Sequence, residues 1–218
     1  MKRYRWLLGC CLFLSIGMLW AADEPDLRML QQKAAQSRDM EGYVGVCKYL
    51  YQTEENPELL LLYADSIHQL ATKSKKPEQL VEYYIWASEG NFIKGDFQQG
   101  YALKRKAIAL AEKAGLKFAI SQSCCDMGYY CNVDARYDSA RYYFRKGLEA
   151  GEDLSEAGEA CRTMLTNYAS SFLFEGKTDS ALVYTIRASE RSAADKDTAM
   201  LIENLNQLGT IYRRKKDL

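Results

Sequence analysis

Residues 121–154 read SQSCCDMGYYCNVDARYDSARYYFRKGLEAGEDL, and this stretch decides the fold of the 218-residue chain. Its first half, to about Val133, predicts one helix. Its second half, from about Tyr137, predicts another, with a short polar turn between them. Gly128 lies in the middle of the first helix and Ala140 in the first turn of the second. Small residues at these places allow an antiparallel helix pair to approach closely, so the stretch predicts a helical hairpin.

The hairpin recurs along the chain with a nearly constant spacing. Small residues in the first helix of each unit follow at steps of 40, 41 and 40 residues; they are Ser88, Gly128, Ala169 and Gly209. Those in the second helix, at steps of 40 and 41, are Gly100, Ala140 and Ala181. This spacing predicts an all-α protein, an α-solenoid of stacked antiparallel helix pairs. The alternative, an ordinary helical bundle with accidental internal similarity, has no reason to keep a constant spacing.

These small positions resemble those of the tetratricopeptide repeat (TPR) family. The likeness covers about residues 77–218 and extends to an aromatic residue near the end of the first helix, Phe172 or Tyr212, and to a later small residue, Ala107 or Ala188. It implies a right-handed α-solenoid. The chain departs from the family in its period of about 40 residues, against about 34 in the family. It also departs at the family's tryptophan position, which holds Tyr84, Cys124, Leu165 and Leu205.

The amino terminus predicts export. Residues 1–22 combine a basic start, a short apolar run over Trp6–Trp20 and the small pair Ala21–Ala22, the pattern of a secretory signal peptide. An uncleaved signal anchor is the alternative. A lipoprotein signal at Cys10 is less well supported, because little apolar sequence precedes it. The predicted location is therefore the periplasm, or the periplasmic face of the inner membrane.

The mature chain divides into two predicted parts. Residues 23–76 predict a divergent helical repeat or cap, because the 40-residue counterparts of Ser88 and Gly100 are Lys48 and Leu60, which are not small. Residues 77–218 predict the TPR-like array. Its last repeat is incomplete, which indicates a fragment of a longer protein or a truncated product. The expected helices are 26–37, 40–51, 57–73, 77–93, 97–113, 117–133, 137–150, 155–174, 178–194 and 197–214.

Five cysteines remain after the leader, and none has the spacing of a metal site. Cys124 and Cys131 fall on one apolar helix face and are expected to be small buried residues. A disulfide between Cys125 and Cys161 is the alternative. With His68 as the lone histidine, the sequence predicts no zinc site, no cofactor and no catalytic residues. The balanced charge, 29 basic against 29 acidic residues, gives no reason to expect nucleic-acid binding.

The TPR resemblance implies a concave groove, lined by the first helices, that holds a protein or peptide, or another segment of the same protein. The implied groove residues are Glu82, Ile85, Glu89, Phe92, Gln122, Tyr129, Asn132, Thr166, Ser170, Leu173, Asn206 and Thr210. We expect a non-catalytic interaction module, the exported sensor or scaffold part of a bacterial signalling protein. A free periplasmic TPR adaptor that assembles a cell-envelope complex is the alternative. An envelope enzyme decorated with TPR repeats would need catalytic sequence beyond these residues.

Overall fold

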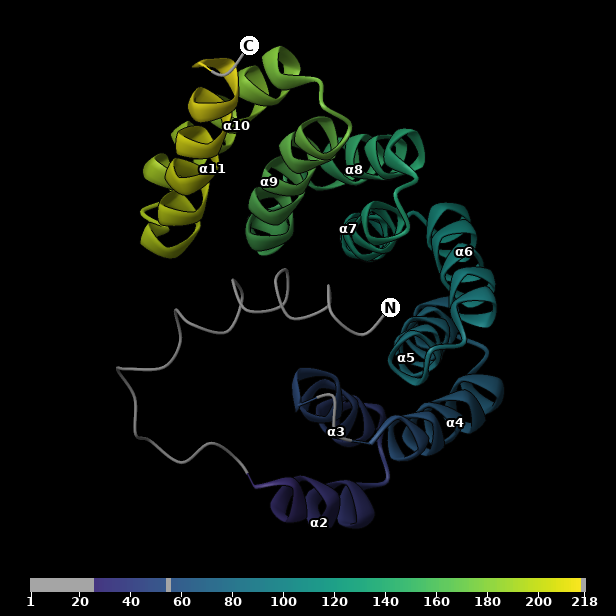
Figure 1. Cartoon of the computed structure of the whole chain (residues 1–218). Helices are drawn as coiled ribbons and strands as arrows, with labels where there is room; N and C mark the ends of the chain where they lie inside the picture. The colour runs from purple at the N-terminus through teal and green to yellow at the C-terminus, as the bar shows by residue number, and fades with distance from the viewer. Residues whose placement is uncertain (1–25, 54–55, 217–218) are drawn as a thin grey trace. The chain divides into compact units, whose positions relative to one another are not determined.

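The structure, a computed structural model, describes residues 26–53 and 56–216. These residues form ten α-helices and one 3-10 turn and contain no strand, so the all-α prediction is confirmed for the described part (Figure 1). The predicted signal peptide, residues 1–22, lies outside the described residues. The elements are α2 (Leu27–Ser37), α3 (Met40–Thr53), α4 (Pro57–Ser74), α5 (Pro77–Lys94), α6 (Phe97–Ala114), α7 (Lys117–Val133), α8 (Tyr137–Gly151), η1 (Ser155–Ala157), α9 (Gly158–Phe174), α10 (Thr178–Ala194) and α11 (Thr198–Lys216).

Local sequence explains where these helices begin and end. Asn56 caps α4 by accepting a hydrogen bond from the backbone N–H of Leu59, and Asp96 caps α6 in the same way. Gly95 and Gly115 end α5 and α6 with φ angles of 93° and 69°, a left-handed conformation that glycine adopts at little cost. The predicted single helix over residues 155–174 is instead a 3-10 turn followed by α9.

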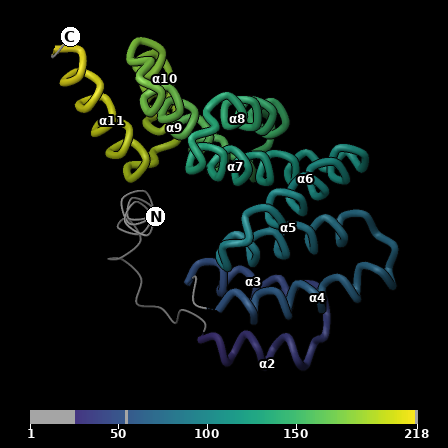
Figure 2. The backbone as a smooth tube through the Cα atoms, turned by 45° about the vertical axis from the view of Figure 1, so that its right-hand side comes forward, coloured from purple at the N-terminus to yellow at the C-terminus, as the bar shows by residue number. Residues whose placement is uncertain are grey.

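The described residues form two compact units, residues 26–164 and residues 165–216. From α2 to α8 each helix of the first unit packs against the next along the chain, as Figure 2 shows for α4, α5 and α6. The predicted boundary between residues 76 and 77 lies at the start of α5, which packs tightly against α4. The boundary between the two units lies instead within α9. Packing of successive helices is consistent with a helical repeat. The proposed role of residues 23–76 as a cap stays a prediction.

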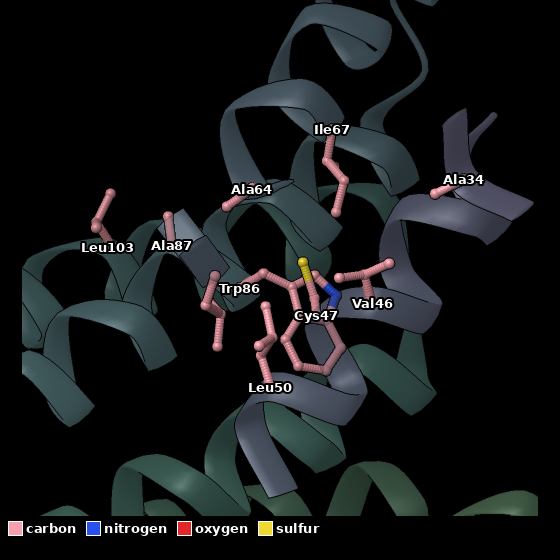
Figure 3. Packing of buried hydrophobic residues seen from close by; sticks show 10 residues of the cluster. Ala34, Val46, Cys47, Leu50, Ala64, Ile67, Trp86, Ala87 and Leu103 are labelled. Atoms are coloured by element: carbon pink, nitrogen blue, oxygen red, sulfur yellow. The ribbon is translucent and has the colours of Figure 1, made fainter. Parts of the chain in front are cut away.

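An apolar core of the first unit contains residues of all the helices from α2 to α6. Figure 3 shows Trp86 beside Leu50, Val46 and Cys47 of α3, with Ile67 of α4 close by. Trp86 is only 8% exposed. A large ring surrounded by aliphatic side chains buries much apolar surface, so this cluster stabilises the amino-terminal helices as one body.

The predicted close approach within hairpins is confirmed in the first unit. A Cβ added to Gly128 would overlap the ring of Phe144 on α8, and a Cβ added to Gly100 would overlap the ring of Phe92 on α5. Each glycine therefore makes room for an aromatic ring of the paired helix. Ala140 is also fully buried.

The second unit has a smaller apolar core. Leu173, Ala181 and Ile211 are buried together, and Phe172 and Leu182 pack against them. Four side-chain hydrogen bonds between buried or half-buried residues also join its helices.

Candidate partner-binding surface

A cluster of charged side chains lies inside the first unit. Lys104 of α6 is fully buried, and its Nζ contacts the carboxylates of Glu89 on α5 and Asp126 on α7, the latter at 2.9 Å. The Tyr130 hydroxyl on α7 donates to the second oxygen of Glu89 at 2.8 Å. These four residues form what we call the charged cluster. Hydrogen bonds between oppositely charged groups are strong when water is excluded, so the cluster ties three successive helices together.

Burial perturbs the titration of this cluster. Removal from water lowers the pKa of the Lys104 ammonium, but the carboxylates of Asp126 and Glu89 together raise this pKa by a larger amount. The pKa of Lys104 therefore lies above its ordinary value. Burial raises the pKa of the Glu89 carboxyl more than the Lys104 ammonium lowers it. The pKa of Tyr130 is also raised, first by burial and then by Glu89. Lys104 therefore stays cationic at neutral pH and satisfies both carboxylates.

Aromatic side chains surround the charged cluster. The ring of Phe92 stacks on that of Tyr130 with centroids 3.6 Å apart. Trp86 donates from Nε1 to a carboxylate oxygen of Glu82 at 2.9 Å, and the Tyr51 ring meets Trp86 edge-on at 6.2 Å. Burial raises the pKa of the Glu82 carboxyl, although the bond from Trp86 opposes this shift. This aromatic packing holds the carboxylates of α5 in fixed positions.

The structure brings the seven predicted groove residues of the first unit onto α5 and α7, but to different depths. Buried among them are Glu89, Phe92 and Asn132; partly exposed are Glu82, Ile85 and Tyr129; exposed is Gln122. The prediction that Glu89 and Phe92 line an open groove is corrected, because both side chains are buried. The first side chain pairs with Lys104 and the second is covered by Tyr130.

The five predicted groove residues of the second unit also differ in exposure. Thr166 and Leu173 are buried, Ser170 and Thr210 are half-buried, and Asn206 is exposed. The Thr166 hydroxyl hydrogen-bonds the side chain of Asn204 at 3.0 Å, and Leu173 belongs to the small apolar core, so neither offers a free surface. A binding role for the accessible members of both sets stays a prediction.

Sequence reasoning missed Lys104 and Asp126, although the period contained a signal. Lys104 stands 40 residues before Phe144, which stands 41 residues before Thr185, so a repeat of about 40 residues would give all three one position in the second helix. Phe144 and Thr185 are buried, which makes a lysine at this position unusual. A buried lysine needs an acidic partner. Asp126 follows Lys104 by 22 residues, and Gln207 accepts from Thr185 at the same separation.

The five cysteines of the described residues are all buried thiols, and the alternative disulfide between Cys125 and Cys161 is not formed. Burial of Cys124 and Cys131 confirms their expected place in the helix packing. Burial raises the pKa of the Cys124 thiol to about 12 and that of Cys125 well above its ordinary value. Because the thiolate is the reactive form, these groups are poor nucleophiles.

Two further features of the described residues bear on chemistry and location. Over residues 26–53 and 56–216, no group of three or more His, Cys, Asp or Glu side chains is placed to hold a metal ion. Within the same residues, none of the helices combines the length and the apolar character needed to cross a membrane.

Comparisons with known proteins bear on the fold alone. No family model matches the chain, and no curated protein matches it by sequence. Among solved structures, the chain is similar to the crystal structure of BtubC (BKLC) from P. vanneervenii, with a TM-score of 0.66 and 14% sequence identity. The match covers 88% of this chain and 80% of BtubC. At this identity the likeness supports the all-helical, repeat-like fold and carries no function with it.

Proposed function

We propose that this chain is a non-catalytic, TPR-like binding protein that holds a protein or peptide along the first helices of its hairpins. The observation that carries the proposal is the charged cluster. It ties α5, α6 and α7 together from inside and leaves Gln122 and Tyr129 accessible on α7. A surface built on a rigid support loses little conformational entropy when a ligand binds, which favours recognition.

The proposed solenoid is right-handed, with a period of about 40 residues. The handedness follows from the TPR resemblance, and the period is supported by a polar contact that repeats. In two hairpins, a side chain of the second helix reaches a residue 22 positions further on: Lys104 contacts Asp126, and Thr185 contacts Gln207. Equivalent contacts at one spacing are expected when successive hairpins stack in the same way. The fold similarity to BtubC agrees with this arrangement.

The accessible residues suit an extended peptide. In the first unit, Ile85 and Tyr129 offer apolar contact, Gln122 can donate to and accept from a peptide backbone, and Glu82 adds a carboxylate. Aromatic side chains beside amide groups are common in protein interfaces, because they combine large contact area with few rotatable bonds. No cofactor takes part in this proposal.

Selection from a random peptide library on the purified chain tests the proposal. Peptides that bind the native chain should bind a Gln122→Ala/Tyr129→Ala variant at least about tenfold more weakly. Tyr142→Ala is the matched control, because this tyrosine is 54% exposed on α8, a second helix of a hairpin. Equal loss of binding in both variants, or in neither, would exclude the face formed by α5 and α7. Circular dichroism of each variant checks that the helices are retained.

We further propose that the array is the exported sensor or scaffold part of a bacterial signalling protein; a free periplasmic adaptor is the second candidate. Both rest on the predicted signal peptide. A fusion to alkaline phosphatase, which is active only after export, should be active with residues 1–22 and inactive without them. The reading frame after Leu218 separates the two candidates: a membrane-spanning segment supports the sensor, and a stop codon supports the adaptor.

A further inference from the structure

Helix α11 presents its polar side chains inward. Asn204 is fully buried: its side chain hydrogen-bonds the hydroxyls of Thr166 on α9 and Ser192 on α10 at 3.0 and 3.2 Å. Gln207 donates to Ser170 on α9 at 2.7 Å and accepts from Thr185 on α10 at 2.9 Å. Most amphipathic helices of globular proteins turn their apolar side inward. Because α11 turns polar side chains inward, some of its apolar residues lie on the outward side.

The outward side of α11 carries an apolar stripe. Ile202 is 60% exposed, and Leu205 and Tyr212 are each 53% exposed. Together with Gly209 they follow one another by three, four and three residues, the spacing of the a and d positions of a coiled coil. We call these four residues the outer stripe. Figure 1 shows α11 at the yellow end of the chain, with α10 packed beside it.

Gly209 is open to approach by another helix. Within the described part of the chain, no neighbouring side chain or backbone comes within 4 Å of where its Cβ would lie. In the first unit, the corresponding stripe of α7 has the same spacing and is wholly buried; its residues are Ser121, Cys124, Gly128 and Cys131. Helix α8 covers that stripe in antiparallel orientation and places a ring against Gly128. A stripe of this spacing therefore accepts an antiparallel helix in this protein.

We propose that α11 of a second copy of this chain covers the outer stripe, so that two copies associate through an antiparallel pair of α11 helices. The stripe is self-complementary about its centre. In this pairing, Leu205 of one copy lies over Gly209 of the other, and Ile202 lies against Tyr212. The large side chain enters the space that the glycine leaves open.

Charge favours the antiparallel orientation. The last turn of α11 carries four basic residues, Arg213, Arg214, Lys215 and Lys216; within the same copy Lys215 pairs with Asp179 and Arg214 donates to the carbonyl of Leu173. The segment leading into α11 carries two carboxylates, Asp195 and Asp197, with Lys196 between them; within the same copy Asp195 pairs with Arg191 and Asp197 accepts from the backbone N–H of Met200. Antiparallel helices place the basic end of each copy beside the acidic entry of the other and also oppose the helix dipoles, whereas parallel helices would place the basic ends together.

Sedimentation velocity of the full chain over a concentration series tests the proposal. One helix pair is smaller than a standard interface, so we expect a monomer–dimer equilibrium with a Kd in the micromolar range. Gly209→Leu should weaken the dimer at least about 30-fold, because the new side chain fills the space that Leu205 of the other copy would enter. The helix should be retained, because this space is open in the monomer. Ile202→Glu should weaken it similarly. Val183→Glu is the control: it makes the same kind of change at an apolar residue that is 57% exposed on α10.

Disulfide trapping tests the orientation. A mixture of Thr198→Cys and Lys216→Cys chains should form a mixed disulfide dimer, and Lys216→Cys alone should form little. The five native thiols of residues 26–53 and 56–216 are buried and react slowly; Cys10 and Cys11 are replaced by serine in both chains so that they cannot form the disulfide. The proposal is overturned by a chain that stays monomeric throughout the series, by open-ended oligomers, or by dimerisation that Gly209→Leu leaves unchanged. The last result would place the contact elsewhere.

Discussion

Replacing Lys104 with methionine tests the charged cluster directly. Methionine has a similar length and packs well in apolar surroundings, so the main change is the loss of the ammonium. Glu89, with 3% of its side chain exposed, and Asp126, with 22% exposed, would then remain close together without a cation. Breaking a buried ion pair by removing one partner typically costs about 3–5 kcal/mol. Asp126 is partly hydrated, and Tyr130 still donates to Glu89, so we expect about 3 kcal/mol, the lower end of that range.

Urea unfolding followed by far-ultraviolet circular dichroism measures this loss. With a slope of about 2 kcal/mol/M, a loss of about 3 kcal/mol lowers the midpoint by about 1.5 M urea. Arg105→Met is the matched control, because it removes a positive charge from the next residue of α6, where the side chain is exposed. Surface substitutions of this kind usually change stability by less than about 0.5 kcal/mol.

A double-mutant cycle attributes the effect to the pair. Glu89→Gln keeps the shape of the side chain and removes its charge. Combining it with Lys104→Met should therefore cost less than the sum of the two single losses, by about 1–3 kcal/mol. A loss below about 1 kcal/mol for Lys104→Met, or simple additivity with Glu89→Gln, would refute the view that this cluster holds α5, α6 and α7 together.

Three further predictions concern the packing and titration of the helices. In thermal unfolding, Gly128→Ala should destabilise the chain by about 1–3 kcal/mol because its site is filled, whereas Gly209→Ala should be neutral or stabilising by up to about 1 kcal/mol. Burial raises the pKa of the Glu203 carboxyl, so the ionised side chain destabilises the folded state at pH values above that pKa. Glu203→Gln should therefore raise the urea midpoint at neutral pH. This gain should vanish at pH values below the pKa of Glu203 in the unfolded chain. Burial raises the pKa of the Cys47 and Cys124 thiols to about 12, so mass spectrometry should show both unmodified after brief iodoacetamide treatment of the native chain and alkylated after unfolding in urea.

Helix positions followed from local signals in the sequence. Pro57 and Pro77 begin α4 and α5, and Gly95 and Gly115 end α5 and α6, as predicted within one residue. These residues fix backbone angles by their own covalent structure, so their effect is visible without tertiary contacts. The same holds for the close approach at Gly128, where only a small residue leaves room for the paired helix.

The depth of the groove residues depended on contacts between hairpins, which local signals do not describe. Glu89 and Phe92 lie on a face that the TPR resemblance assigns to the ligand. Tyr130, from the following hairpin, contacts both of them. Lys104 reaches Glu89 from α6. Whether Glu89 and Phe92 are accessible therefore depends on a residue about 40 positions further along the chain. Their exposure could be assigned only once the packing of one hairpin on the next was known.

In the proposed repeat of about 40 residues, the residues at one core position suggest how the order of the hairpins is specified. Lys104, Phe144 and Thr185 would occupy equivalent places in that repeat, but they need different surroundings: a carboxylate, an apolar space and a hydrogen-bonding amide. Asp126 supplies the carboxylate to Lys104, and Gln207 supplies the amide to Thr185. A hairpin stacked out of order would leave a buried lysine or hydroxyl without its partner, at a cost of several kcal/mol for the charge. Buried polar contacts in a repeat protein can thus select one arrangement among similar units that apolar packing alone would accept.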